Sequence, residues 1–243
     1  SNYTYIACTT PGIAFAGDNS YDFGQGSASS TDWVSGGTTY PEVYQPTNPS
    51  GIATSYTYLT EKASQAGITP VNLETVCNVS NCTLPANLPH GVYQANTNVN
   101  LNTYTFPINQ DYVFLINGDL TVRGNIFTPV GSVAVFSTSG DIIVDAAVGW
   151  YPTFLFSNMD GIWSTDHSFI VNSTNTCNDL SLSIACTVVT NASLTGGSFE
   201  NNRDLCGFDS QYATTYFYQR LDMILNMPEF MKVQNNVSWE VAP

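Results

Sequence analysis

The chain has 243 residues, of which 10% are charged, and its 19 acidic and 5 basic residues give a formal charge of −14. Five scattered cations cannot neutralise a phosphate backbone, which argues against nucleic-acid binding. The length suits one all-β domain with a substantial core, and low charge with abundant Thr, Tyr and Asn is typical of exported β proteins, which indicates an extracellular or cell-surface protein.

The N-terminal segment, 1–50, is rich in Gly, Ser, Thr, Tyr and Pro, with short strands expected at 3–7 and 12–16. Segment 18–24 places oxygen-bearing side chains at alternate positions, as a Ca²⁺ loop does, but it lacks the turn glycine and the closing bidentate Glu. We interpret it as a polar turn. A bound Ca²⁺ is the alternative interpretation, and no other cofactor is predicted.

One α-helix is predicted at about 51–66, with Ser50 as its cap and Gly67 as its stop. Its apolar stripe, Ile52, Tyr56, Leu59, Ala63 and Ala66, covers a single face. Such a helix is expected to cover the end or side of a β core. The chain therefore divides into a cap region, 1–91, which also holds a disulfide loop, and a repetitive region, 92–243, with a C-terminal closing segment.

Six cysteines predict disulfides, because an even number is typical of exported proteins. Zinc is the rival, but neither C-x2-C spacing nor suitably placed histidines accompany them. Closing the shortest loops first gives Cys77–Cys82, Cys177–Cys186 and Cys8–Cys206, and the other connectivities stay open.

One pattern occurs twice, at 118–123 and again at 140–145, each time after an apolar run. In each copy apolar and polar residues alternate, as in a strand, behind a Gly-Asp turn. The repeat predicts an all-β fold, a parallel β-helix (β-solenoid), with Leu120 stacked inside on Ile142 and Arg123 near Asp145 outside. A meander of antiparallel hairpins is the alternative.

The pattern breaks at Trp150-Tyr151-Pro152 and resumes over 161–163 and 168–171. The spacing from Val144 to Val171 is longer than the spacing from Val122 to Val144, so this coil is expected to hold an insertion. The tail at 212–225 is expected to form a strand or a short helix, and 239–243 to close against the body.

Parallel β-helices are common among enzymes that cut acidic polysaccharides, and the hydrolases among them need two carboxylates on one face. A lyase usually needs Ca²⁺ or a basic residue to neutralise the substrate carboxylate, and this chain has few basic residues. Asp160, Asp166 and His167 lie within one coil and are the candidate catalytic residues of this alternative. Asp119 and Asp141 are explained as turn residues, because they occupy equivalent places in the repeat. Nucleophile-elbow, phosphate-binding and dinucleotide-binding motifs are absent from the sequence.

Exposed aromatic side chains on a rigid acidic surface can stack on sugar rings or pack against another protein. The candidates for such ligand binding are Trp33, Trp150, Tyr151 and Trp163.

Four segments carry a resemblance: 15–18 (FAGD), 22–33 (DFGQGSASSTDW), 114–120 (FLINGDL) and 239–243 (WEVAP). Together they resemble a family of uncharacterised exported, pilin-like or surface β-helix proteins of candidate phyla radiation bacteria. The resemblance covers residues 13–243. It implies a cell-surface β-helix behind a membrane-anchored N-terminal part, and it carries over no active-site residue. Asp166-His167 at a turn departs from the family.

We therefore expect an extracellular structural or adhesive protein, with a surface-filament subunit as a close variant. The expected partner is a surface glycan or protein, or a second copy of the chain. Contact with a membrane is expected only through an anchor upstream of this chain. The alternative is a polysaccharide hydrolase or lyase on the same scaffold.

Overall fold

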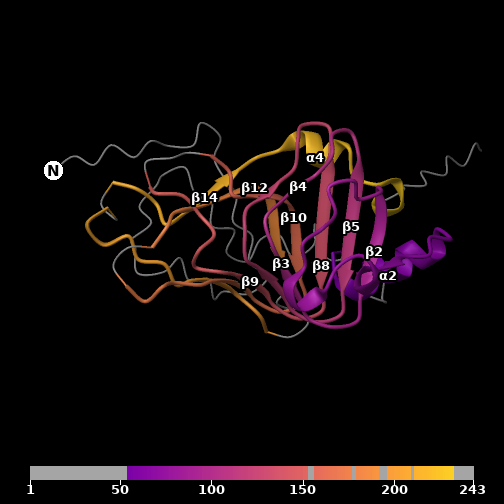
Figure 1. Ribbon diagram of the computed structural model, residues 1–243, viewed down its shortest axis with the longest axis horizontal. Coiled ribbons are helices and arrows are strands. Elements are labelled where there is room, and N and C mark those ends of the chain that lie inside the picture. The colour runs from indigo at the N-terminus through magenta and orange to yellow at the C-terminus, as the bar shows by residue number, and fades with distance from the viewer. Residues whose placement is uncertain (1–53, 153–155, 177–178, 192–195, 209–210, 233–243) are drawn as a thin grey trace, which may run out of the picture.

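A computed structural model describes residues 54–152, 156–176, 179–191, 196–208 and 211–232 (Figure 1). The described strands pair in parallel and wind into a β-solenoid, which confirms the predicted fold class. They form a nine-stranded sheet, called sheet A here, and a five-stranded sheet, sheet B.

Along its main path, sheet A runs β1 (Val71–Asn72), β2 (Gly91–Ala95), β5 (Asp111–Ile116), β8 (Val133–Thr138), β10 (Met159–Thr165), β12 (Leu182–Thr190) and β14 (Thr215–Tyr218). Off this path, β4 (Tyr104–Thr105) pairs with β7 (Ile126–Phe127), which also pairs with β10. Sheet B consists of β3 (Val99–Leu101), β6 (Leu120–Val122), β9 (Ile142–Val144), β11 (Phe169–Val171) and β13 (Phe199–Asn201).

The register of sheet B is the one that the sequence repeat predicts. Leu120 pairs with Ile142 and Val122 with Val144, and all four side chains are buried inside. Asp145 N–H donates to the Val122 carbonyl, so Arg123 and Asp145 follow paired strands on the outside. Of the two, Arg123 is exposed, and among the described residues they form no ion pair with each other. The hairpin alternative is wrong, because these strands run parallel.

The turns between sheet A and sheet B form a ladder of repeated hydrogen bonds. Asp119 N–H donates to Asn98 Oδ1, Asp141 N–H to Asp119 Oδ1 and Ser168 N–H to Asp141 Oδ1, each at 2.9 Å. Gly140 is required here because a Cβ would lie 2.2 Å from Asp119 Oδ1 of the previous coil. Asp119 and Asp141 are therefore turn residues, as their places in the repeat suggest.

The inner face of sheet A carries a column of aromatic rings. Tyr93 stacks on Phe114 with ring centroids 5.4 Å apart, Phe114 on Phe136 at 5.0 Å, and Phe136 on Trp163 at 4.1 Å. The rings occupy paired positions of β2, β5, β8 and β10. Parallel in-register pairing brings equivalent side chains of successive coils together, and this column forms part of the inner core.

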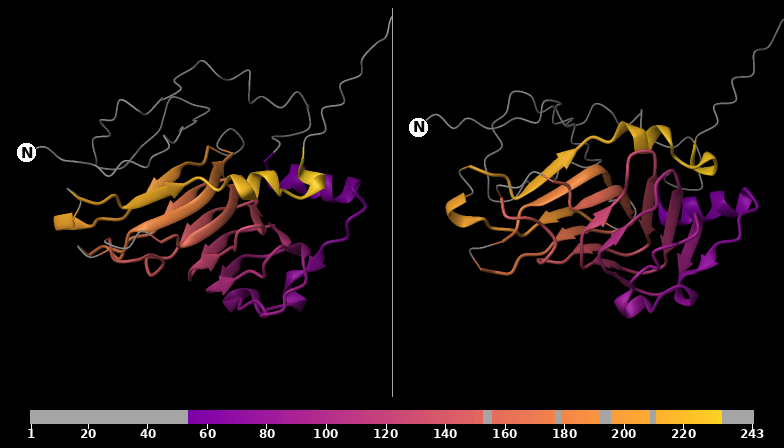
Figure 2. Two further views of the ribbon diagram at one scale, coloured as in Figure 1. Left: turned by 90° about the horizontal axis from the view of Figure 1, so that it is seen from above. Right: turned by 45° about the horizontal axis from the view of Figure 1, so that its top comes forward.

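Helix α2 (Tyr56–Gln65) covers the outer face of sheet A, where Leu59 and Ala63 pack on residues such as Val113 and Leu115 (Figure 2). Its N-cap is Ser55, whose side chain accepts a hydrogen bond from Tyr58 N–H. The helix thus begins later than predicted, and predicted positions Ser50 and Ile52 lie outside the described residues. Gly67, with φ of +70°, follows its C-terminal end as predicted.

The N-terminal end of the solenoid is closed by the segment after α2. Within this segment lie β1, which pairs with β2, and the 3₁₀-helices η1 (Leu73–Thr75) and η2 (Val79–Asn81). Leu73, Leu84 and Leu88 close the inner core here. The predicted Cys77–Cys82 disulfide is present, and Cys82 forms a parallel β-bridge with Leu101 of β3.

The predicted tail contains both a strand and a helix. After β14 come α4 (Leu221–Leu225) and the 3₁₀-helix η4 (Glu229–Met231), which lie on the same side of the molecule as α2 (Figure 2). Met223 is fully buried in the outer cluster of apolar residues beneath them. Segment 239–243 lies outside the described residues. Of the described helices, none combines the length and the apolar character needed to cross a bilayer.

The predicted Cys177–Cys186 pair is wrong, because Cys186 is a free thiol. It lies inside β12, which pairs with β10 on one side and β14 on the other, and its side chain packs into the outer cluster. Cys206, in the 3₁₀-helix η3 (Cys206–Phe208), is disulfide-bonded. Its predicted partner Cys8 lies outside the described residues, so that pairing stays a prediction.

Candidate functional site

The structure separates the four aromatic residues proposed as ligand contacts. Trp150 and Tyr151 are exposed on the loop that follows β9. Trp163 is fully buried in the aromatic column, so its assignment as a ligand contact is wrong. Its place in the core follows from its register with Phe136. Trp33 lies outside the described residues.

Two further rings join the exposed pair. Phe208 meets Tyr151 edge to face with centroids 5.5 Å apart, and Tyr212 lies 6.2 Å from Phe208. Tyr151 is 49% exposed, and Trp150 and Phe208 are each 37% exposed. We call the linked rings of Tyr151, Phe208 and Tyr212, together with the adjacent exposed Trp150, the aromatic cluster. It presents large ring surfaces to solvent, which suits contact with sugar rings or with another protein.

The aromatic cluster lies on the loops that leave sheet B, and these extend to the left in Figure 1. Trp150 exchanges backbone hydrogen bonds with Ser181 of the next loop, at 3.0 and 2.9 Å. Tyr212 N–H donates to the Phe208 carbonyl at 2.9 Å. The rings therefore stand on several loops that are joined to one another.

Arg203 is the residue that ties these loops together. Its buried guanidinium donates to the carbonyls of Leu180 at 2.7 Å, Asp145 at 3.0 Å and Asn172 at 3.2 Å. Burial lowers the pKa of Arg203 to about 10, while the nearby Asp179 and Asp145 act in the opposite direction. At neutral pH the side chain is still charged, so it holds three backbone segments with charge-assisted hydrogen bonds.

Asp179 supports the same loops from a second position. Its carboxylate accepts from Ser173 Oγ at 2.6 Å, Thr174 N–H at 2.8 Å and Asp204 N–H at 2.9 Å. Burial alone would raise the pKa of Asp179, but these hydrogen bonds to the charged form lower it below its ordinary value. The aromatic cluster thus stands on a fixed platform, which reduces the entropy lost when a ligand binds.

Asp166, a candidate of the enzyme alternative, caps helix α2. Both of its carboxylate oxygens accept from Tyr56 N–H at 3.1 Å, and Oδ1 accepts from Asn191 Nδ2 at 3.0 Å. A carboxylate at a helix N-terminus satisfies an unpaired donor and the helix dipole. Burial raises the pKa of Asp166, and these two hydrogen bonds oppose the rise.

Asp160 lies on the outer face of β10, beneath the chain that leads into α4. Its Oδ2 accepts from Thr128 N–H at 3.0 Å and is 3.7 Å from Arg220 Nη1. Burial raises the pKa of Asp160, although Thr128 and Arg220 act in the opposite direction. These contacts hold the C-terminal segment on the sheet and leave the carboxylate buried.

The structure does not bring the three enzyme candidates together. Asp160 lies near the start of the extended strand β10 and Asp166 directly follows its end, a span of about 20 Å. Glycosidase carboxylates are about 5–10 Å apart. His167 is exposed and contacts Asp141 of the previous coil. The pair that this alternative requires is thus not formed by these residues.

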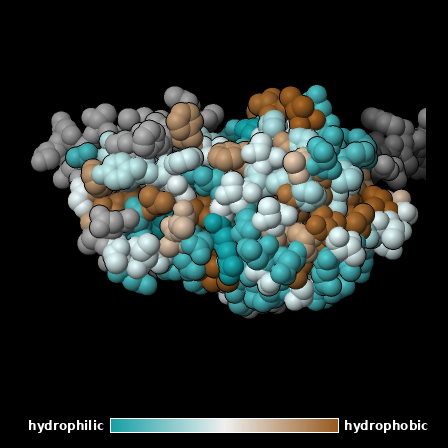
Figure 3. Space-filling view, viewed as in Figure 1, coloured by the Kyte–Doolittle hydropathy of each residue, from teal (hydrophilic) through white to brown (hydrophobic). Residues whose placement is uncertain are grey.

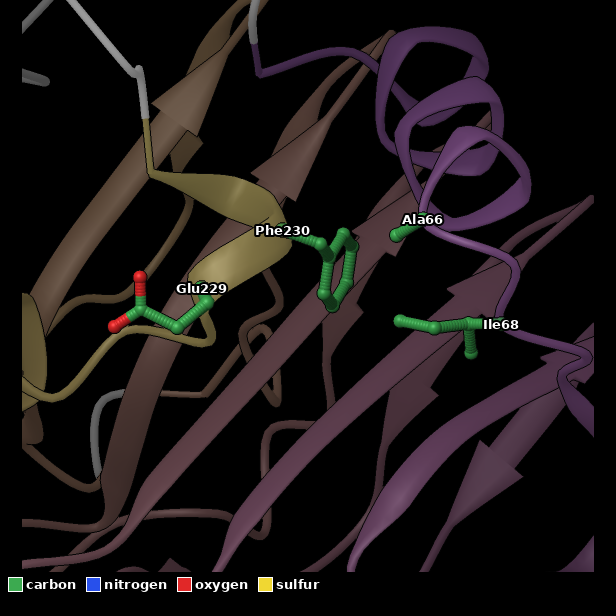
Figure 4. Close-up of a pocket in the computed structure, with 4 residues that line it drawn as sticks. All are labelled: Ala66, Ile68, Glu229 and Phe230. Atoms are coloured by element: carbon green, nitrogen blue, oxygen red, sulfur yellow. The ribbon is translucent and has the colours of Figure 1, made fainter.

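A shallow hollow of about 410 Å³ lies between α2 and η4 (Figure 4). Phe230 points toward Ala66 and Ile68 across it, whereas Glu229 points away. This lining is mostly apolar and offers one carboxylate, so the hollow does not suit acid–base chemistry.

The predicted Ca²⁺ alternative at 18–24 lies outside the described residues. Within the described ranges, no three His, Cys, Asp or Glu side chains gather as a metal site would require. For the described residues, the aromatic cluster is therefore the best candidate for a functional site.

Sequence reasoning missed Phe208, Tyr212, Arg203 and Asp179. The two rings belong to a loop far along the chain from Tyr151, and no repeat connects them. The rarity of basic residues was the one sequence signal for Arg203. A basic side chain that is buried usually has a structural use, so each of the 5 basic residues was a candidate for such a role. Searches of protein families, curated proteins and solved structures find no match to this chain.

Proposed function

We propose that this protein is an extracellular adhesive protein of the cell surface that binds a glycan through the aromatic cluster. The observation that carries the proposal is the exposure of Trp150, Tyr151 and Phe208 on loops that Arg203 holds together. Loops on a rigid scaffold are the usual place for binding residues. Aromatic rings contribute much of the binding energy at such surfaces because they bury a large area with little loss of entropy.

The chemistry of the chain supports the proposed extracellular location. The Cys77–Cys82 disulfide favours an oxidising environment outside the cytosol. The formal charge of −14 opposes aggregation by repulsion between copies of the chain. Because few residues are charged, abundant Ser, Thr and Asn side chains supply much of the polar surface.

A surface-filament subunit is the close variant of this proposal, because both functions use the solenoid as a rigid spacer. The polysaccharide hydrolase or lyase is the other class of function. The length of β10 separates Asp160 from Asp166, so the carboxylate pair gives this class no support.

The experiment that tests the proposal is a glycan-array screen of the purified protein, repeated with Ca²⁺ and with EDTA. Phe208→Ala should abolish the binding of any captured glycan. The matched control is Phe156→Ala, because Phe156 is 68% exposed and stands outside the ring contacts of the cluster. Equal loss in both variants, or no glycan bound at all, would reject the aromatic cluster as a glycan site. Cleavage of the bound glycan would favour the enzyme.

A further inference from the structure

Two outer turns of the solenoid repeat each other at the edge opposite the Gly-Asp turns. Pro107-Ile108-Asn109 precedes β5, and Pro129-Val130-Gly131 precedes β8 at the same place in the next coil. The turns are stacked, because Ser132 Oγ donates to the Pro107 carbonyl at 2.8 Å. Their tips, Ile108 and Val130, are 65% and 72% exposed. The repeat thus places two aliphatic side chains in solvent on adjacent coils.

Helix α4 lies against the second of these turns. Arg220 Nη1 donates to the Thr128 carbonyl at 3.1 Å, and Gly131 N–H donates to Asp222 Oδ2 at 3.4 Å. Leu225 lines a surface hollow together with Asn109 and Gly131, so the helix reaches both turns. Met223 of α4 faces the core, whereas Leu221, Ile224 and Leu225 are 41–74% exposed.

Because α4 adjoins both turns, we group their exposed aliphatic side chains as the aliphatic patch: Ile108, Val130, Leu221, Ile224 and Leu225. An apolar area is visible over α4 at the top of the molecule (Figure 3). Contiguous exposed apolar side chains on a soluble protein usually mark an interaction surface.

The charges around the aliphatic patch are mostly paired. Arg220 forms an ion pair with Asp222 at 2.7 Å, and Lys232 with Glu229 at 2.5 Å. Asp111 adds one further carboxylate to the rim. Two of the chain's 5 basic residues therefore lie here, in a protein whose formal charge is −14. The patch is close to neutral on a strongly acidic molecule.

We propose that the aliphatic patch is the contact between two copies of this chain. A two-fold contact sets the same surface against itself, so it requires a surface that does not repel its own charge. The aliphatic patch meets this requirement because it is apolar and its rim charges are largely cancelled. An acidic lipid surface, the other common target of exposed aliphatic residues, would be repelled by a protein of this charge. The inference is independent of the aromatic cluster, which lies on other loops.

The test is sedimentation equilibrium of the full chain over a wide range of concentration, at low and at high salt. We expect a monomer–dimer equilibrium that tightens as salt rises, because salt screens the repulsion between two acidic copies and leaves apolar contact intact. Val130→Ser and Leu225→Ser should each raise the dimer dissociation constant roughly tenfold or more, as expected for the loss of a buried aliphatic side chain.

The matched control is Val71→Ser on strand β1, at the closed N-terminal end, where Val71 is 47% exposed. It carries the same substitution as Val130→Ser and should leave the dimer unchanged. Circular dichroism spectra establish that each variant is folded. A chain that stays monomeric at every concentration would overturn the proposal, as would a dimer that Val130→Ser and Leu225→Ser do not weaken, or one that high salt dissociates.

Discussion

The turns at the two ends of the strands of sheet B are held in different ways; we call these two rows of strand ends the entering and the leaving edge. At the edge that enters sheet B, each coil repeats one contact, in which a backbone N–H donates to a side-chain oxygen of the preceding coil. Beyond the opposite strand ends, where the chain leaves sheet B, the loops are joined by unlike side-chain contacts, chiefly those of Arg203 and Asp179. The first arrangement spreads stability over many equal contacts, whereas the second concentrates it in a few residues. The candidate binding site stands on the second.

The largest effect on stability is expected in the stacked coils of the solenoid, which we call the stack. Trp163→Ala removes a fully buried ring from the aromatic column and should lower the free energy of unfolding by about 3–5 kcal/mol, measured by urea denaturation. Trp150→Ala removes the same side chain from the leaving edge, where it is 37% exposed, and should cost about 0.5 kcal/mol. Similar losses in both variants would contradict the assignment of Trp163 to the core and Trp150 to the surface.

Arg203→Ala should loosen the leaving edge alone. It leaves three carbonyls without their charged donor and is expected to cost about 2–3 kcal/mol. Hydrogen exchange should accelerate in the loops after β9 and β11, while amides of β5 and β8 keep their protection. Arg123→Ala, at an exposed position, is the control and should change neither. Uniform loss of protection would mean that the loops and the stack unfold as one unit.

Acid should weaken the loops through Asp179. Burial acts to raise the pKa of this carboxyl, but its hydrogen bonds lower the pKa below the ordinary value near 3.8. The stability it contributes is therefore present above that value and is lost as the pH falls through the lowered pKa. Asp179→Asn should cost about 1–2 kcal/mol at neutral pH, and the difference from wild type should shrink below about pH 4. Thermal unfolding at both pH values measures this difference, with the exposed Glu200→Gln as control.

The opposite dependence of stability on pH is expected for Asp160 and Asp166. Burial raises the pKa of both carboxyls, so the stability they contribute is present below about 3.8 and is lost as the pH rises through the raised values. Asp160→Asn should therefore gain stability relative to wild type as the pH rises above about 3.8, whereas Asp179→Asn loses stability relative to wild type as the pH rises toward that value from below. Parallel pH profiles of the two variants would refute this contrast.

The smallest effect is expected at the entering edge. Asp119→Ala removes a carboxylate that accepts from Asp141 N–H and from the exposed Asn98 Nδ2, in a turn that its neighbours also hold, and should cost about 0.5–1 kcal/mol in urea denaturation. A loss as large as that of Arg203→Ala would show that the ladder is not a sum of equal contacts.

The repeated parts of the fold could be predicted because the spacing of the sequence repeat determines the register in which the strands pair. Leu120 and Ile142 hold the same place in the two copies of the pattern, and parallel pairing puts them in contact. The same rule applied to Tyr93, Phe114, Phe136 and Trp163 would have placed Trp163 in the core. Judging each aromatic residue singly loses this information.

The leaving edge could not be predicted, because its contacts join residues without a common period. Arg203 reaches the distant Asp145 only after the coils are stacked. The predicted Cys177–Cys186 pair is wrong for a related reason: a short separation in sequence does not determine pairing, and Cys186 is a free thiol within strand β12. The candidate site, which depends on such contacts, was found only in part.

The insertion between Val144 and Val171 shows what this architecture permits. The chain between them is longer than the chain between Val122 and Val144, yet Val171 pairs with Val144 in register. The extra length is absorbed in a loop and does not reach the stack. The solenoid is thus a display scaffold: its recognition surface can lengthen, shorten or change sequence while the fold stays constant. Variation among natural forms of this protein should gather after β9, β11 and β13, and foreign peptides grafted there should be tolerated.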